Sequence, residues 1–122
     1  MGDQSSSAPW AVSPSGSTLI GATTYTGRTN TEKIVAFVLD NSIAAKICYD
    51  LSLSGFTDWW LPSTPYEIDD MYNFKTQLGL SGNYWSSDEF IYYKAYYYDM
   101  TNNYRVSLAK TDTNKVRAIR YF

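Results

Sequence analysis

The spacing of apolar residues changes along the chain, from a helical period before residue 80 to a strand period after it. Between residues 29 and 79, apolar side chains recur at intervals of three and four positions, which is typical of amphipathic helices. From Tyr84 onward, short runs rich in aromatic and β-branched residues alternate with turn-forming residues, which is typical of strands. Helices followed by an antiparallel sheet predict an α+β fold, and 122 residues are enough for one domain with one core.

The first 16 residues, rich in Ser, Pro and Gly, predict an extended arm in which Trp10 is the one large apolar anchor. A short strand is expected at Ser17–Ile20. Helices are then expected at about 31–39 and 43–51. The residues expected to cap these helices are Thr29 with Glu32 for the first, and Asn41 or Ser42 for the second.

A third helix is expected from Thr64 to Gly79. Thr64 is the expected cap, Pro65 suits the first helical position, and Glu67 completes a capping box with Thr64. Gly79 supplies the terminator, because glycine readily adopts the left-handed conformation that ends many helices. The region after it is expected to contain strands at 84–87, 92–99, 104–108 and 115–122, with a tight turn at Asn102 and Asn103.

Composition argues against catalysis. The chain has no histidine and one cysteine, so Ser–His and Cys–His nucleophiles and an internal disulfide are absent. Cys48 lies in an apolar helical pattern, which predicts a buried, inert thiol. Asp69 and Asp70 sit where the helix dipole favours negative charge, and Asp88 and Glu89 point to opposite faces of a strand. We therefore expect no enzyme activity, metal or cofactor.

A formal net charge of -2 argues against nucleic-acid binding and against binding to a membrane surface. No run is long enough for a transmembrane helix, so membrane insertion is not expected, and no signal peptide is visible. Basic residues outnumber acidic ones only in 90–122, and this third of the chain favours an anionic ligand.

Three blocks, "GFTDWWLPS" at 55–63, "NYWSS" at 83–87 and "KVRAIRYF" at 115–122, closely resemble the domain family at the C-terminus of the Legionella collagen-like adhesin. The resemblance covers nearly the whole chain. It implies a C-type lectin-like fold, carried by bacterial surface proteins, adhesins and phage tail proteins. Some members look like the targets of diversity-generating retroelements, which rewrite adenines in the C-terminal coding region.

The resemblance assigns structural rather than catalytic roles to the matching residues. These are Asp58, Trp59, Leu61, Pro62, Tyr84, Trp85, Ser86, Ser87, Glu89, Val116, Arg117, Ile119 and Arg120. Two family features are missing: a first β-hairpin, whose absence leaves a sheet edge open or filled by a partner or by the arm, and a cysteine that would pair with Cys48. The sequence signatures of calcium-dependent sugar sites are absent too.

Between Asp88 and Asn114, most residues are of types that an Asn codon reaches by changes of adenine, which fits a diversified region spanning 84–122. The same mixture resembles an antibody paratope, in which tyrosine supplies stiff contact area and short polar residues supply hydrogen bonds. Strand alternation places Ala95 and Tyr97 toward the core and predicts at least three exposed tyrosines. The expected contact face is Tyr92, Lys94, Tyr96 and Tyr98. The other candidate contacts are Trp60, Asp88, Phe90, Tyr93, Asn102, Asn103, Tyr104 and Arg105.

The sequence therefore predicts a ligand-binding or adhesion domain, displayed outside the cell on a bacterial surface protein or a phage tail fibre, with a protein or glycan receptor as its partner. Two alternatives stay open. One is an electrostatic adhesin for sulfated or acidic polysaccharide that uses Lys94, Arg105, Lys110 and Lys115. The other is a structural tip that packs its aromatic residues in a homotrimer and has no ligand of its own.

Overall fold

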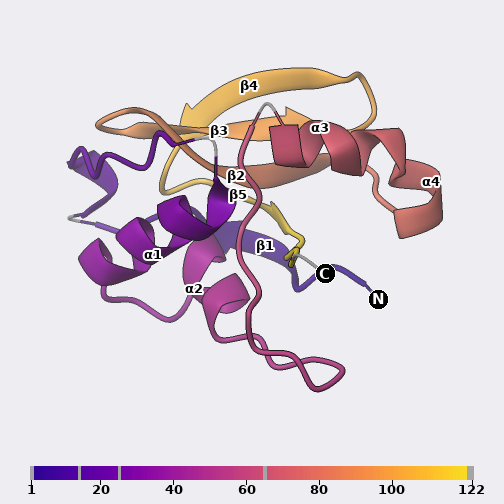
Figure 1. Ribbon diagram of the computed structural model, residues 1–122. Helices are drawn as coiled ribbons and strands as arrows, with labels where there is room; N and C mark the ends of the chain where they lie inside the picture. Colours follow the sequence, from indigo (N-terminus) through magenta and orange to yellow (C-terminus); the bar gives the residue numbers. More distant parts are fainter. Residues whose placement is uncertain (1, 14, 25, 65, 121–122) are drawn as a thin grey trace.

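The computed structural model describes residues 2–13, 15–24, 26–64 and 66–120, and it confirms the α+β class. Helices pack on a curled sheet of five strands (Figure 1). The elements are β1 Ser5–Pro9, the 3-10 helix η1 Ser15–Ser17, α1 Gly27–Phe37, α2 Ala44–Tyr49, α3 Tyr66–Asn73, α4 Lys75–Leu78, β2 Asn83–Ile91, β3 Lys94–Asp99, β4 Tyr104–Ala109 and β5 Thr113–Val116.

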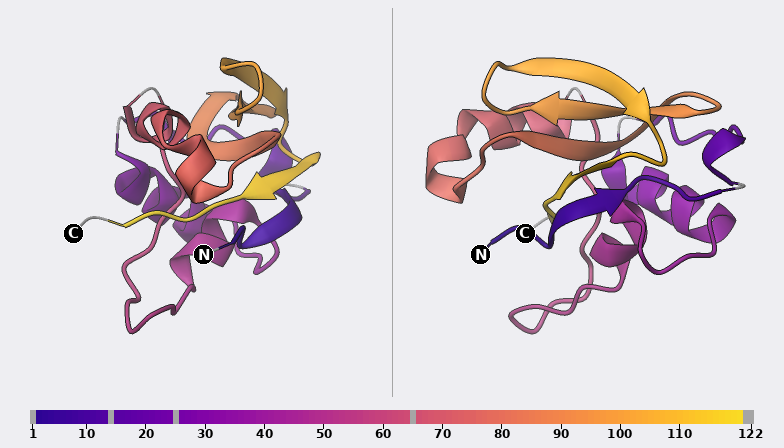
Figure 2. Two further views of the ribbon diagram at one scale, coloured as in Figure 1. Left: turned by 90° about the vertical axis from the view of Figure 1, so that its right-hand side faces the viewer. Right: turned by 180° about the vertical axis from the view of Figure 1, so that it is seen from behind.

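The strand order in the sheet is β1-β5-β2-β3-β4. β2, β3 and β4 form an antiparallel meander in which Tyr98 lies opposite Tyr84 on one side and Arg105 on the other. β5 then crosses back to lie parallel to β2, and β1 pairs with β5 in the antiparallel sense, as the view from behind shows (Figure 2). The expected hairpin around Asn102 and Asn103 is confirmed, with Asn103 at a φ of 64°.

The N-terminal arm supplies an edge strand, β1, which pairs with β5 on one side. The strand expected at Ser17–Ile20 is wrong, because this region contains the 3-10 turn and the arm pairs earlier, over Ser5–Pro9. Trp10 anchors the arm as expected: its side chain is fully buried and its Nε1 donates to the carbonyl of Ser86 at 2.9 Å. The indole of Trp85 donates in return to the carbonyl of Ala8 at 2.7 Å.

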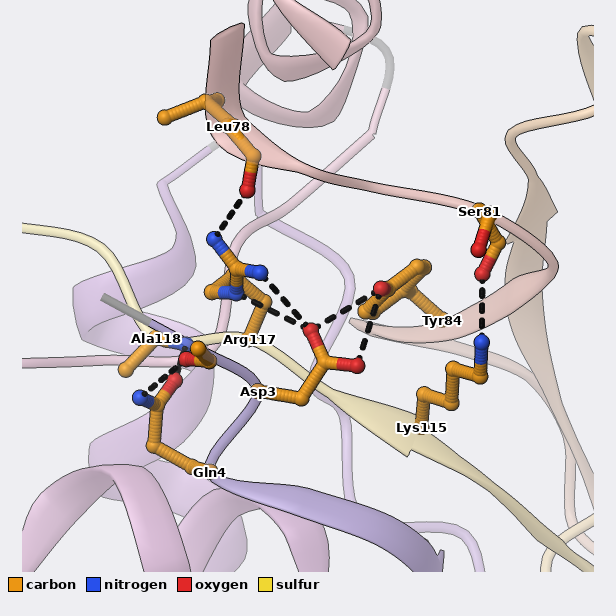
Figure 3. Close-up of polar contacts among 9 residues, drawn as sticks. Asp3, Gln4, Leu78, Ser81, Tyr84, Lys115, Arg117 and Ala118 are labelled. Carbon is orange, nitrogen blue, oxygen red and sulfur yellow. Dashed lines mark hydrogen bonds and ion pairs between the residues drawn. The ribbon is translucent and has the colours of Figure 1, made fainter. Parts of the chain in front are cut away.

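Polar contacts fasten the start of the arm to the C-terminal segment (Figure 3). The carboxylate of Asp3 accepts from Arg117 Nη2 at 2.9 Å and from the hydroxyl of Tyr84 at 2.9 Å. A different nitrogen of this guanidinium, Nη1, donates to the carbonyl of Leu78 at 2.9 Å, at the end of α4. Arg117 therefore links the arm, β5 and the helical layer, which agrees with the structural role that its motif implied.

The first two helices begin at different residues from those expected. α1 starts at Gly27 after a Thr26 N-cap, earlier than Thr29 predicted, and ends at Phe37. This start requires glycine at position 27, because the backbone there packs against that of Leu61. An added Cβ would lie 2.3 Å from the carbonyl oxygen of Leu61. α2 follows Ile43, which makes no side-chain cap hydrogen bond, so the prediction of Asn41 or Ser42 as the cap is wrong.

The third helix is divided at Phe74 into α3 and α4, and it ends at Gly79 in the left-handed conformation as expected. The predicted capping box is wrong in its partner, because the N–H and the hydroxyl of Thr64 both donate to Asp88. Glu67 accepts from the backbone N–H of Ser63 at 2.9 Å rather than from that of Thr64. The same carboxylate also accepts from the N–H of Gly27 at 2.9 Å, so it joins the starts of two helices. Pro65 lies outside the described residues.

The sheet has an apolar cluster on each side, because neighbouring residues on a strand point to opposite faces. Trp85 enters the larger cluster, under α1 and α2, whereas its neighbour Tyr84 enters the smaller one, under α3. In the side view, α3 and α4 flank the meander and α1 and α2 lie below it (Figure 2). Ala95 and Tyr97 face the larger cluster, as predicted. The expected strand at 115–122 ends at Val116, and residues 121–122 lie outside the described residues.

A fully buried ion pair joins three segments beside this core. Lys110 Nζ lies 2.6 Å from the carboxylate of Glu89, and neither side chain is exposed to solvent. The carboxylate also accepts from the backbone N–H groups of Ile20 and Gly21, each at 2.7 Å, and Lys110 donates to the carbonyl of Thr18 at 3.0 Å. Both charges are therefore satisfied by hydrogen bonds, which a buried pair needs if it is to be tolerated.

Replacing Lys110 by Met leaves the buried Glu89 carboxylate without its counter-charge. We expect Lys110→Met to lower the free energy of unfolding by about 3–5 kcal/mol, the usual loss when one member of a buried pair is removed. Urea titration followed by tryptophan fluorescence measures this loss. The control is Lys33→Met, an exposed lysine on α1, which should change the stability by less than about 0.5 kcal/mol. Equal effects of the two substitutions would contradict the structural role of the pair.

Candidate ligand-binding face

The predicted contact residues fall into three groups in the structure: buried residues, residues at one end of the meander, and residues at its other end. In Figure 1 the β2–β3 turn lies at the left end of the sheet, away from α3. The β3–β4 turn lies at the right end, near α3 and α4. The candidates do not converge on one point, because β3 separates the two turns by six residues, or about 17 Å of strand.

Trp60 and Tyr98 are buried, so the prediction that they are exposed contacts is wrong. Tyr98 is 7% exposed and its ring lies 6.1 Å from that of Tyr72, because α3 covers this half of the sheet face. Trp60 is 2% exposed. Its backbone pairs with Ile119 through hydrogen bonds of 2.9 and 3.0 Å, which fixes the C-terminal segment against the 57–60 segment.

Asp88 is also buried, and it positions the strand rather than contacting solvent. Its carboxylate accepts from the hydroxyl of Thr64 at 2.6 Å, from the backbone N–H of Thr64, and from the amide of Asn30 at 3.2 Å. Burial raises the pKa of Asp88, and the hydrogen bonds from Thr64 oppose this rise. This network ties β2 to the starts of α1 and α3.

Three side chains form an aromatic face on the part of the meander that α3 leaves uncovered. The rings of Phe90 and Tyr96 lie 5.1 Å apart, and the guanidinium of Arg105 lies over the Tyr96 ring at 4.2 Å from its centroid. Phe90 is 46% exposed, Arg105 is exposed and Tyr96 is half-buried. We call Phe90, Tyr96 and Arg105 the aromatic face.

The hairpin tip, Tyr92, Tyr93 and Lys94, lies next to this face at the β2–β3 turn. The rings of Tyr92 and Tyr93 contact each other at 4.9 Å and are 56% and 40% exposed. Lys94 Nζ lies 5.7 Å from the Tyr93 ring. The backbone N–H of Lys110 donates to the carbonyl of Tyr93 at 2.9 Å, so the buried ion pair described above also holds the tip.

Asn102, Asn103 and Tyr104 lie at the other end of β3. Asp99 accepts from the backbone N–H groups of Thr101 and Asn102, at 2.9 and 3.1 Å, and this closes the turn. Tyr104 is 63% exposed. Of the five tyrosines between residues 92 and 99, only Tyr92 and Tyr93 are exposed, so the expectation of at least three exposed tyrosines from strand alternation is wrong: Tyr96 and Tyr97 are half-buried and Tyr98 is buried.

The four cations of the polysaccharide alternative do not share one surface. Lys110 is buried against Glu89, and Lys115 donates to the carbonyl of Ser81 at 2.7 Å. Lys94 and Arg105 are the two that remain beside the exposed aromatic rings. The structure therefore does not support Lys110 as a contact for an anionic ligand.

Within the described residues, no three Cys, Asp or Glu side chains gather in a way that could hold a metal ion. In the same part of the chain, no helix is both long and apolar enough to cross a bilayer. Cys48 is buried, as predicted, and burial raises the pKa of its thiol far above the usual range.

Sequence reasoning missed a hollow between α1 and the 57–60 segment. Its lining includes Trp59, to which the sequence blocks assigned a structural role, and Tyr49, to which the sequence assigned no role. The residues come from separate segments, so no local spacing could have indicated it. The role of Asn30 in holding Asp88 had no signal in the sequence either.

No family model matches the chain, and no curated protein matches it.

The pKa values of Asp88, in β2, and Asp99, at the end of β3, should be shifted in opposite directions. Burial raises the pKa of Asp88 above the ordinary value of 3.8, whereas the hydrogen bonds from Asn102 hold that of Asp99 below it. Carbon-13 NMR of the side-chain carboxyls measures both pKa values in one sample, with Asp99 as the internal control. Identical pKa values would contradict the buried position of Asp88.

The same shift gives a pH dependence of stability. Because the folded chain binds the Asp88 proton more tightly than the unfolded chain does, protonation of this group adds stability as the pH falls through its folded pKa toward 3.8. Asp88→Asn should remove that contribution. The free energy of unfolding of the native protein, measured relative to that of the variant, should therefore rise as the pH falls. Urea titrations of both proteins at neutral and at mildly acidic pH test this expectation.

Proposed function

We propose that this chain is a ligand-binding domain with a C-type lectin-like fold, which presents the aromatic face and the hairpin tip to a protein or glycan receptor on a cell surface. The observation that carries the proposal is the grouping of Phe90, Tyr92, Tyr96 and Arg105 at the end of the sheet that α3 leaves uncovered. Aromatic residues and arginine carry most of the binding energy in many interfaces.

The strand beneath these rings is fastened to neighbouring segments by hydrogen bonds, and this supports a recognition role. The hydroxyl of Ser86 donates to the carbonyl of Tyr96 at 2.8 Å, while Asp88 and Glu89 are bound to other segments by buried hydrogen bonds. A rigid support lowers the entropic cost of binding, because the contact side chains are already held in place.

The C-type lectin-like assignment rests on the sequence blocks and on where they lie. Their polar residues make structural bonds: Glu89 pairs with Lys110, Arg117 with Asp3, and Arg120 Nε with Asp58 at 2.7 Å. The start of β1 and the end of β5 lie at the other end of the molecule from the hairpin tip (Figures 1 and 2). A carrier joined at either end would leave the tip accessible.

The proposal includes display outside the cell, on a bacterial surface protein or a phage tail fibre, and diversification of 84–122 by a retroelement. The surrounding DNA tests diversification directly. A near-repeat of the final coding segment, beside a reverse transcriptase gene, is the expected finding. An isolated gene without such a repeat would contradict diversification and leave the receptor-binding proposal standing.

Removing two exposed rings and the arginine should weaken binding strongly. Fluorescently labelled protein is tested on a panel of intact bacterial cells by flow cytometry. We expect the triple variant Phe90→Ala, Tyr92→Ala and Arg105→Ala to weaken binding at least about tenfold, because hot-spot residues each contribute about 2 kcal/mol or more. Helix content, measured by circular dichroism, should stay unchanged, since these side chains lie on the sheet surface.

The matched control is Phe74→Ala, which removes a 58% exposed ring beside α3, on the helical layer. It should bind cells as the native protein does. Equal binding by the triple variant would overturn the proposed face. A stable trimer in dilute solution, which the triple variant dissociates into monomers, would instead favour the structural tip, and sedimentation velocity distinguishes the two.

A further inference from the structure

A groove of about 630 Å³ lies between α1 and the 57–60 segment, and it belongs to neither the aromatic face nor the hairpin tip. Its side chains include Arg28, Glu32, Tyr49, Asp58 and Trp59. The volume is in the range of small-ligand sites, which are commonly about 300–1,000 Å³.

One wall of the groove is a single stripe of α1. Arg28, Glu32 and Ala36 are spaced four residues apart, so they lie above one another on one helix face. Arg28 Nε lies 3.5 Å from the carboxylate of Glu32, and both side chains are more than half exposed. The stripe therefore offers a donor and an acceptor side by side, on a helix whose backbone is fixed by packing.

The opposite wall is held in place by contacts within the 56–60 segment. The indole of Trp59 donates to the carbonyl of Phe56 at 3.0 Å, which fixes the plane of the ring. Arg120 binds Asp58 through two hydrogen bonds, of 2.7 and 3.0 Å, and its guanidinium lies 3.7 Å above the Phe56 ring. The aromatic surface of Trp59 is thus set before any ligand arrives.

The charges around the groove are paired. Arg28 balances Glu32, and Arg120 balances Asp58. Lys46, whose Nζ lies 5.4 Å from the Tyr49 ring, pairs with Asp50 at 3.0 Å. A cationic or anionic ligand would therefore meet no surplus of opposite charge, and a purely apolar ligand would have to desolvate these charged groups without replacing their hydrogen bonds.

We propose that this groove binds a short neutral saccharide. A sugar ring has an apolar face of C–H groups that fits a flat aromatic surface, here Tyr49 and Trp59. Its hydroxyls are donors and acceptors at once, so they can bind the guanidinium of Arg28 and the carboxylate of Glu32 together. A neutral polyol thus meets all three features of the groove: the rings, the mixed polar stripe and the zero net charge.

The test uses the purified chain and an array of neutral oligosaccharides of glucose, galactose, mannose and N-acetylglucosamine, with sialylated and sulfated sugars on the same array. We expect neutral sugars to bind. The best binder is then titrated while tryptophan fluorescence is recorded. Arg28→Ala and Tyr49→Ala should each weaken its binding at least about tenfold, the effect of losing about 1.4 kcal/mol. Both residues are exposed, so neither substitution should lower the thermal midpoint by more than a surface change does.

The matched controls are Lys33→Ala, another exposed cation of α1, and Tyr66→Ala, a 64% exposed tyrosine at the start of α3. Both should bind the sugar as the native protein does. No binding to any neutral sugar, or binding to acidic sugars alone, would overturn the proposal. Sugar binding that survives Arg28→Ala and Tyr49→Ala but is lost in the triple variant of the aromatic face would place the sugar on that face. That outcome would overturn the groove and support the receptor-binding proposal.

Discussion

The buried ion pair between Glu89 and Lys110 fixes the geometry on which the exposed face depends. Both charges are removed from water, and such charges are tolerated only where every lone pair and proton finds a partner. Those partners are backbone groups of the 18–21 segment, so the pair draws this loop, β2 and the end of β4 together. The backbone N–H of Lys110 then donates to the carbonyl of Tyr93, so the residue that forms the ion pair also fixes the hairpin tip.

A second buried network explains why one part of the meander is covered and the other is not. Asp88 fixes Thr64, which comes just before α3, so the helix begins beside the middle of β2. From there α3 covers Tyr98 and Tyr84 and leaves Phe90 exposed and Tyr96 half-buried. The candidate face is therefore the area that the start of α3 leaves free. In the same way, the contacts of Arg120 with Asp58 and Phe56 hold one wall of the groove beside α1.

Much of the fold follows from local pattern. The change from a helical to a strand period, the terminator at Gly79 and the turn at Asn103 depend on conformational preferences of a few neighbouring residues, and these predictions are confirmed. The arm was harder, because the polar run Ser5–Pro9 has little strand propensity of its own. It becomes a strand because β5 offers an unpaired edge and because Trp10 and Trp85 bind across it. The start of α1 was missed for a similar reason, since the position of Gly27 is set by its packing against Leu61 and Glu67.

The sequence by itself determined the chemistry that the exposed end of the sheet can offer, which is that of tyrosines, an arginine and short polar residues, without histidine. Strand alternation could also separate Ala95 and Tyr97 from their neighbours, because that separation is a property of one strand. Only the tertiary structure decided which residues of the other face stay exposed. Tyr96 and Tyr98 are equivalent along β3, and α3, which lies more than twenty residues earlier in the chain, covers one and spares the other. Burial of that kind depends on contacts between segments distant in sequence, and no local period encodes it.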